Sequence, residues 1–385
     1  MFARPPDYPT FVSWLITGAT RNWRGLLGAL LATWFNLPLA IFLGGVGLVM
    51  GGILGYFGGF VGADTVGVEY ITDVPVLGTM LKSFLVQSGG IVGGLGGAAV
   101  GAIGGFVGGL VLPWALVAAD DPAKALGLML AQLVVALLVG VLYTIFEIAA
   151  EGWLMRINGY REPSRREKEL IMPVLTECAR RLHLGGYPKL LIDDSRQPNA
   201  YAGSRHIVVA RGFLDEFNYE TEPLAGALCH ELTHWRNADA ISGMFVRGIA
   251  LPLYLTYVVV TRLTRVFRHP VIEFLSWAIA WPLLVAIRYF VMPLQAAGSR
   301  AAEYRADQGA VKAGFSAGQR RVLSRFRRSF DGARNGWELS VCATHPPNEL
   351  RLERLEELGV RYWLPDQDAP ARPLPVVMTS ALTRD

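Results

Sequence analysis

The chain of 385 residues is 52% hydrophobic, only 18% charged, and carries a formal net charge of +4. An ordinary soluble domain has about a quarter charged residues, so this composition argues against one and favours an integral membrane protein. No dense basic stripe with interleaved aromatic residues is present, which argues against a nucleic-acid-binding protein. The three cysteines cannot all pair, which fits a reducing compartment.

The first half of the chain contains three apolar segments that are long enough to cross a membrane. They are residues 37–62, 84–119 and 125–145, and none of them contains a charged residue. No secretory signal is apparent near the N-terminus, because an apolar core followed by a small-residue cleavage site is missing there. The sequence therefore predicts an N-terminal cytoplasmic segment, residues 1–36, and a transmembrane region, residues 37–150.

Basic residues flank this region on both sides, at residues 4–24 and 156–168. Because arginine and lysine accumulate in cytoplasmic loops, we expect both flanks, and the domain that follows, to face the cytoplasm, most simply at a bacterial inner membrane. Three single passes would place that domain outside. We therefore expect residues 84–119, which exceed the length of one pass, to form a hairpin or a re-entrant segment.

Glycine recurs at strict four-residue spacing in the first two apolar segments. The rows are Gly47, Gly51, Gly55 and Gly59, then Gly89, Gly93, Gly97, Gly101, Gly105 and Gly109. In a bilayer, a glycine face lets two helices approach closely. This glycine zipper could pack helices within one chain or between subunits, or act as a flexible or membrane-remodelling segment. Because the row exceeds what one dimer contact needs, we expect a homo-oligomer.

The pentad His230-Glu231-Leu232-Thr233-His234 is the most informative motif of the chain. Helical periodicity over residues 221–235 places it in mid-helix. Positions i and i+4 share a helix face, so both imidazoles can reach one metal ion while Glu231 points toward water on that ion. The pattern predicts a zinc peptidase site with His230 and His234 as ligands and Glu231 as general base. The alternative is a buried polar helix whose histidines only form hydrogen bonds.

A catalytic zinc ion needs a third protein ligand. A histidine six residues after His234 would supply one, but that position holds Ala240. Glu303 and Asp307 lie one helical turn apart beyond a second apolar pair, residues 246–295, that we expect to form a membrane or interfacial hairpin. We expect Glu303 to be the third ligand and Asp307 to orient a ligating histidine. The alternative is a solvated charged face.

Four motifs, in this order, resemble the HtpX and CAAX prenyl protease family of integral-membrane zinc metallopeptidases. They are Asn-Ala-Tyr-Ala at 199–202, the pentad, residues 299–307, and Thr-His-Pro-Pro at 344–347. The resemblance implies a gluzincin domain with one Zn²⁺ ion. It also implies that Asn199, Ala200, Tyr201 and Ala202 lie on or near the edge strand that pairs with substrate, and that His345 helps to stabilise the oxyanion. By themselves, Asn199 could be a turn residue and His345 a helix-entry residue.

The predicted fold class is mixed: a multi-span α-helical membrane region plus a mainly α, α+β gluzincin-type domain split by a membrane insertion. Residues 151–245 and 296–385 would form the two parts of the catalytic domain. The predicted function is hydrolysis of peptide bonds in protein or peptide substrates by a zinc metalloendopeptidase embedded in the lipid bilayer. Two alternatives are a glycine-zipper scaffold or pore with a vestigial or regulatory zinc domain, and a zinc-dependent regulator that binds substrates without cleaving them.

Overall fold

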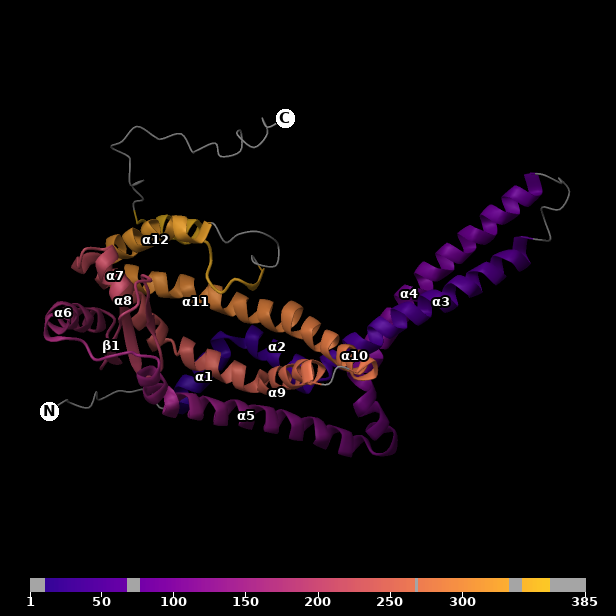
Figure 1. The fold of residues 1–385 in the computed structure, drawn as a ribbon, viewed down its shortest axis with the longest axis horizontal. Coiled ribbons are helices and arrows are strands. Elements are labelled where there is room, and N and C mark those ends of the chain that lie inside the picture. Colours follow the sequence, from indigo (N-terminus) through magenta and orange to yellow (C-terminus); the bar gives the residue numbers. More distant parts are fainter. Residues whose placement is uncertain (1–10, 68–76, 267–268, 332–340, 361–385) are drawn as a thin grey trace. The chain divides into compact units, whose positions relative to one another are not determined.

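The computed structural model describes residues 11–67, 77–266, 269–331 and 341–360 (Figure 1). These residues are mainly helical and contain one small sheet. They divide into two compact units. One unit comprises the described parts of residues 1–18, 148–241 and 299–385, and the other comprises residues 19–147 and 242–298.

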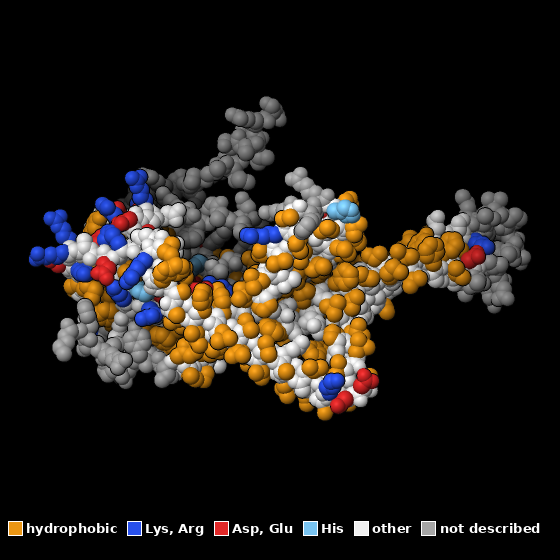
Figure 2. Space-filling view, turned by 60° about the horizontal axis from the view of Figure 1, so that its bottom comes forward, with side chains coloured by type: hydrophobic (Ala, Val, Ile, Leu, Met, Phe, Trp, Pro, Cys, Tyr) orange, Lys and Arg blue, Asp and Glu red, His pale blue; other side chains and the backbone are white. Residues whose placement is uncertain are grey.

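Five helical segments of the described residues are long and apolar enough to cross a membrane: Leu37–Asp64, Lys82–Asp120, Pro122–Ile157, Asp239–Leu263 and Pro270–Lys312. Figure 2 shows that hydrophobic side chains cover most of the visible surface of the long helices. Leu95 and Val100, for example, are 70% and 73% exposed. Such side chains are stable in contact with lipid rather than water, so the prediction of a membrane-embedded chain is confirmed.

Two short helices, α1 (Phe11–Arg21) and α2 (Trp23–Trp34), precede these segments. The segments themselves are formed by α3 (Leu37–Gly67), α4 (Leu77–Asp120), α5 (Pro122–Ile157), α9 (Asp239–Val266), α10 (Pro270–Ala286), the π-helix η1 (Ile287–Val291) and α11 (Met292–Lys312). The last three run on from one another and together form the candidate segment Pro270–Lys312.

The two glycine rows face each other within one chain, because α3 and α4 lie side by side along them (Figure 1). A methyl group added at Gly47 would collide with the backbone of Gly101, and one added at Gly51 would collide with that of Gly97. Only residues without a side chain allow this approach. The intrachain packing accounts for the four-residue spacing, and the homo-oligomer stays a prediction.

The expected hairpin or re-entrant segment within residues 84–119 is wrong, because α4 is one continuous helix. The glycine row keeps α4 against α3 from Gly89 to Gly109. A break would forfeit that contact and leave backbone polar groups without partners in lipid. Pro113 lies inside the helix without ending it. A hairpin in α4 therefore does not explain how the domain that follows α5 could face the cytoplasm.

The sheet of the other unit has the order β1-β3-β2. Strands β1 (Lys189–Asp193) and β3 (His206–Ala210) pair in parallel, as their Val/Ile/Leu-rich sequences favour. Strand β2 (Ala200–Ala202) pairs antiparallel to β3, and no other strand of the described residues pairs with its outer edge. The helices of this unit are α6 (Arg165–Arg181), α7 (Arg211–Glu216), α8 (Thr221–Arg236), α12 (Ser316–Asp331) and α14 (Asn348–Glu357).

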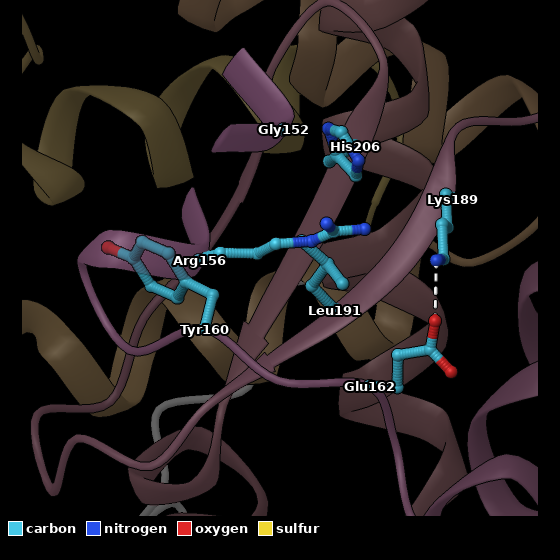
Figure 3. Close-up of a pocket in the computed structure, with 7 residues that line it drawn as sticks. All are labelled: Gly152, Arg156, Tyr160, Glu162, Lys189, Leu191 and His206. Carbon is cyan, nitrogen blue, oxygen red and sulfur yellow. Dashed lines mark hydrogen bonds and ion pairs between the residues drawn. The ribbon is translucent and has the colours of Figure 1, made fainter. Parts of the chain in front are cut away.

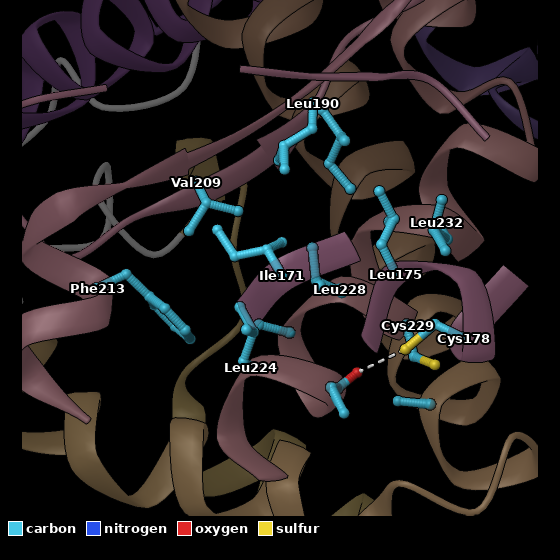
Figure 4. Packing of buried hydrophobic residues seen from close by; sticks show 14 of the residues in the cluster. Ile171, Leu175, Cys178, Leu190, Val209, Phe213, Leu224, Leu228, Cys229 and Leu232 are labelled. Carbon is cyan, nitrogen blue, oxygen red and sulfur yellow. Dashed lines mark hydrogen bonds between the residues drawn. The ribbon is translucent and has the colours of Figure 1, made fainter. Parts of the chain in front are cut away.

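The core of this unit lies between the sheet and helices α6 and α8, as Figure 4 shows. Helix α8 contributes Leu224, Leu228 and Leu232 to it, and all three are essentially fully buried. Their four-residue spacing puts them on one face of the helix. The histidines of the pentad fall on a different face, so hydrophobic packing of α8 directs them away from this core.

Candidate metal centre

Three side chains from two helices converge on one point. His230 and His234 of α8 and Glu303 of α11 each offer a ligand atom, and these atoms lie within 4.8 Å of one another. The two Nε2 atoms are 3.1 Å apart. His230 Nε2 lies 3.4 Å and His234 Nε2 lies 3.5 Å from a carboxylate oxygen of Glu303. The structure thus brings together the two histidines and the glutamate that the sequence singled out.

The outer nitrogen of each ring meets a carboxylate. His230 Nδ1 is 3.0 Å from Asp307 Oδ1, and His234 Nδ1 is 2.8 Å from Asp239 Oδ2. A carboxylate at Nδ1 holds the proton on that nitrogen and leaves a lone pair on Nε2. Both lone pairs then face Glu303, where two imidazoles and a carboxylate make a donor set that suits zinc.

The electrostatics of the centre favour a positive charge. Burial lowers the pKa of His234, but hydrogen bonds to Asp239 and Glu303 outweigh it and raise the pKa to about 10. Nitrogen lone pairs and a carboxylate oxygen this close repel one another unless a positive charge lies among them, which is a proton when no metal is bound and can be replaced by a metal ion. The residues present therefore fit a divalent metal ion.

Glu231 lies beside this cluster and is partly buried. Its Oε2 accepts a hydrogen bond of 2.9 Å from the backbone N–H of Ala202 in β2. Burial raises the pKa of Glu231, although the two neighbouring histidines oppose the shift. A raised carboxyl pKa brings proton uptake and release closer to neutral pH.

Of the remaining predicted residues, His345 contacts the centre directly, and residues 199–202 lie in or just before the strand whose Ala202 holds Glu231. His345 places Nδ1 2.9 Å from Glu303 Oε1 while its side chain stays 60% exposed. Asn199 precedes β2, and its carbonyl accepts from the N–H of Ala210 at 2.9 Å. Ala200, Tyr201 and Ala202 form β2 itself.

Sequence reasoning missed three residues of the centre. Arg351 of α14 is buried, donates two hydrogen bonds of 2.8 Å and 2.7 Å to Asp307, and lies 3.0 Å from Glu303. Gln319 of α12 donates to Asp307 at 2.8 Å. The third is Asp239, described above.

Two of the missed residues had a signal in the sequence. Arg351 and Gln319 occupy positions on the apolar faces of their helices, beside Leu352 and Leu355 and beside Val322 and Leu323. A charged or amide side chain on such a face needs a buried partner. Asp239 had no comparable signal.

A hollow of about 80 Å³ is lined by residues other than those of the metal centre (Figure 3). It contains no residue that the sequence predicted for the site, and it is too small for a peptide. Its lining residues are Gly152, Arg156, Tyr160, Glu162, Lys189, Leu191 and His206.

Comparisons with known proteins point to one family. Among curated proteins, the chain is similar to protease HtpX homologues. That of Salinibacter ruber is 28% identical over 261 residues, which cover 61% of this chain and 89% of the relative. That of Methylacidiphilum infernorum is 24% identical over 257 residues, covering 58% and 84%. The solved structure of Ste24p from S. mikatae aligns with 91% of this chain and 100% of its own at 15% identity and a TM-score of 0.41.

The family match itself spans both halves of the metal centre. Residues 165–359, about half of the chain, match peptidase family M48. This range includes the pentad, Glu303, His345 and Arg351. The prediction of a metallopeptidase that is similar to HtpX is confirmed. The chain belongs to peptidase family M48 and is a membrane-embedded metalloprotease.

Proposed function

We propose that the protein is a zinc endopeptidase in which His230, His234 and Glu303 hold one Zn²⁺ ion per chain. The observation that carries this proposal is the convergence of their three ligand atoms within 4.8 Å. Asp307 and Asp239 would keep the histidine lone pairs directed inward. The chemistry that zinc supplies in such a site is Lewis acidity, which lowers the pKa of a coordinated water and polarises a substrate carbonyl.

Glu231 would act as general base and then as general acid. Its hydrogen bond from Ala202 occupies Oε2 and leaves the other oxygen able to accept a proton from the attacking water. The same proton then passes from Glu231 to the nitrogen of the leaving amine, so the carboxylate is regenerated at the end of each turnover. The raised pKa of Glu231 supports both transfers.

Strand β2 would pair with the substrate backbone. The register of β2 against β3 determines which backbone groups of β2 are free to do so. Gly203 donates to His206 and Ala210 donates to Asn199, so the alternation of an antiparallel ladder turns the backbone of Tyr201 toward β3. The backbones of Ala200 and Ala202 then face the free edge. Because Glu231 takes the N–H of Ala202, the N–H and C=O of Ala200 and the C=O of Ala202 are left for an extended peptide.

His345 would donate a hydrogen bond to the oxyanion that develops on the attacked carbonyl. Its contact with Glu303 places it next to the proposed ligand, and its exposed ring remains accessible to substrate. Arg351 would hold Glu303 and Asp307 in position from the buried side.

We also propose that the catalytic residues face the cytoplasm at a bacterial inner membrane. Three continuous helices, α3, α4 and α5, separate the two basic flanks, and the flank after α5 has five basic residues against three at residues 4–24. Support comes from this larger group, since such residues accumulate on the cytoplasmic side. They are Arg156, Arg161, Arg165, Arg166 and Lys168. Protease protection of sealed inside-out and right-side-out vesicles tests this orientation, because only inside-out vesicles should expose residues 165–245 to an added protease.

The function is tested with purified protein in detergent and an unstructured substrate such as casein. Cleavage should stop when a chelator removes the metal and return when zinc is restored, with about one zinc ion bound per chain. A vestigial or regulatory zinc domain would bind zinc, and a regulator would also bind casein, but neither would cleave it. Full zinc occupancy without cleavage would therefore reject the endopeptidase.

A further inference from the structure

Among the described Asp and Glu side chains, Glu151 is the buried one that lies outside the metal centre. It is 6% exposed and belongs to the last turns of α5. Burying a carboxylate is costly unless hydrogen bonds replace its water. Its partners therefore show what this residue does.

The Glu151 carboxylate accepts hydrogen bonds from the turn that joins β2 to β3. The backbone N–H groups of three successive residues, Ser204, Arg205 and His206, donate to it at 3.1 to 3.2 Å. The hydroxyl of Ser204 donates as well, and His206 Nδ1 lies 3.2 Å away. Figure 3 shows His206 close to Gly152, the residue that follows Glu151.

The carboxylate and the turn approach so closely that a side chain at Gly203 would not fit. A Cβ atom added there would collide with Glu151 Oε1. Three consecutive N–H groups form a concave donor site for an anion, and here the anion is a side chain of the same protein. We refer to Glu151 and residues 203–206 as the carboxylate clamp.

The clamped turn is connected to the proposed catalytic residues on both sides. The carbonyl of Ser204 accepts a hydrogen bond of 2.9 Å from Trp235, the residue after His234. Ala202, which enters the turn from β2, donates to Glu231. A shift of the turn would therefore move the N–H that holds Glu231 and the strand edge that is left for substrate.

We propose that Glu151 is a positioning residue for peptide cleavage, which acts through the turn on β2. This inference rests on the proposed function. The charged carboxylate is needed because it accepts at both oxygens, and both oxygens face donors. Glutamine accepts at one oxygen only, and its amide N–H₂ would face N–H groups.

The first measurement is hydrogen exchange of the zinc-loaded, full-length protein in detergent. In Glu151→Gln, the amides of residues 204–206 should exchange at least about tenfold faster than in the wild type, because their acceptor is lost. Glu169→Gln is the matched control. Glu169 is an exposed acid on α6 that pairs with Arg165 of the same helix, so exchange of the turn should not change.

The second measurement separates positioning from a general loss of structure. It compares kcat and KM for an extended peptide and for the same peptide with N-methylated backbone, which cannot pair fully with β2. Glu151→Gln should lower kcat/KM about tenfold on the extended peptide and clearly less on the methylated one. The variant and the N-methyl groups both disturb pairing of the substrate with β2, so their effects are not additive. Glu151→Asp, which keeps the charge, should retain more activity than Glu151→Gln.

Equal losses on both peptides would overturn the proposal, and so would wild-type exchange of residues 204–206 in Glu151→Gln. If Glu151→Gln does not fold, Ser204→Ala removes a single donor and must show the same selective loss in weaker form. The exchange result does not depend on the catalytic role of Glu231. Unchanged cleavage by Glu231→Gln would thus reject the proposed function without rejecting the contact between Glu151 and the turn.

Discussion

The metal centre and the α3–α4 pair are specified in opposite ways. At the metal centre, buried polar side chains from separate helices hold one another, as when Arg351 binds Asp307 and approaches Glu303. Between α3 and α4, contact depends on side chains that are absent, as at Gly47 and Gly101. The first arrangement is sensitive to charge and hydrogen-bonding groups, and the second to volume. Four substitutions break or sharpen this contrast.

Glu303→Ala should have the largest effect, because it removes a proposed zinc ligand and leaves Arg351 without one of its carboxylate partners. Stable zinc binding and cleavage should both disappear, as metal analysis and a casein assay would show. Glu357→Ala, which removes an exposed acid on α14, is the control. A protein that keeps full zinc occupancy without Glu303 would exclude this residue as a ligand.

Glu231→Gln should separate zinc binding from catalysis. Glutamine preserves the volume and can still accept from Ala202, but it cannot take a proton from water. Turnover should therefore fall by about 10²-fold or more while zinc content stays at the wild-type level. Retained cleavage at full zinc occupancy would remove Glu231 from the mechanism.

His345→Ala should lower kcat by about a hundredfold with zinc content and melting temperature unchanged, because an exposed donor to the oxyanion is lost. His183→Ala is a suitable control, since His183 follows α6 and is not among the proposed site residues. A variant with wild-type kcat would show that the contact of His345 with Glu303 has no part in turnover.

Replacing Gly97 and Gly101 by leucine should have the smallest effect on zinc content. The added side chains would meet the backbones of Gly51 and Gly47, and overpacking of this kind costs about 1–3 kcal/mol per site. A lower melting temperature at unchanged particle mass, measured by light scattering, would agree with packing inside one chain. A smaller particle would instead show that the glycines join subunits.

The matched control for the glycine pair is leucine at Gly96 and Gly104, which lie on α4 with open space around them. Both double variants add the same hydrophobic volume to the same helix. Wild-type stability of the Gly97/Gly101 variant would contradict the packing seen between α3 and α4.

Much of the site could be predicted because its pattern is local or is demanded by chemistry. His230 and His234 are four residues apart on one helix, and that spacing by itself brings them together. Glu303 was indicated because a zinc site needs a third ligand and Glu303 shares a helix face with Asp307, one turn later. Gln319 and Arg351 come from other helices, and their partner Asp307 is distant in sequence. Asp239 lies only five residues after its partner His234, but it lies beyond the end of α8, where helical spacing no longer predicts which side chains meet.

The sequence by itself determined which segments are apolar enough to enter a membrane, where the pentad helix lies, and which side chains can bind a metal, because composition and helical periodicity are local properties. Only the tertiary structure decided that α4 continues unbroken along α3, that Arg351 and Gln319 close on Asp307, and that Glu151 holds the turn before β3. These outcomes depend on backbone approach and on hydrogen bonds between segments far apart in the chain, which no local pattern encodes.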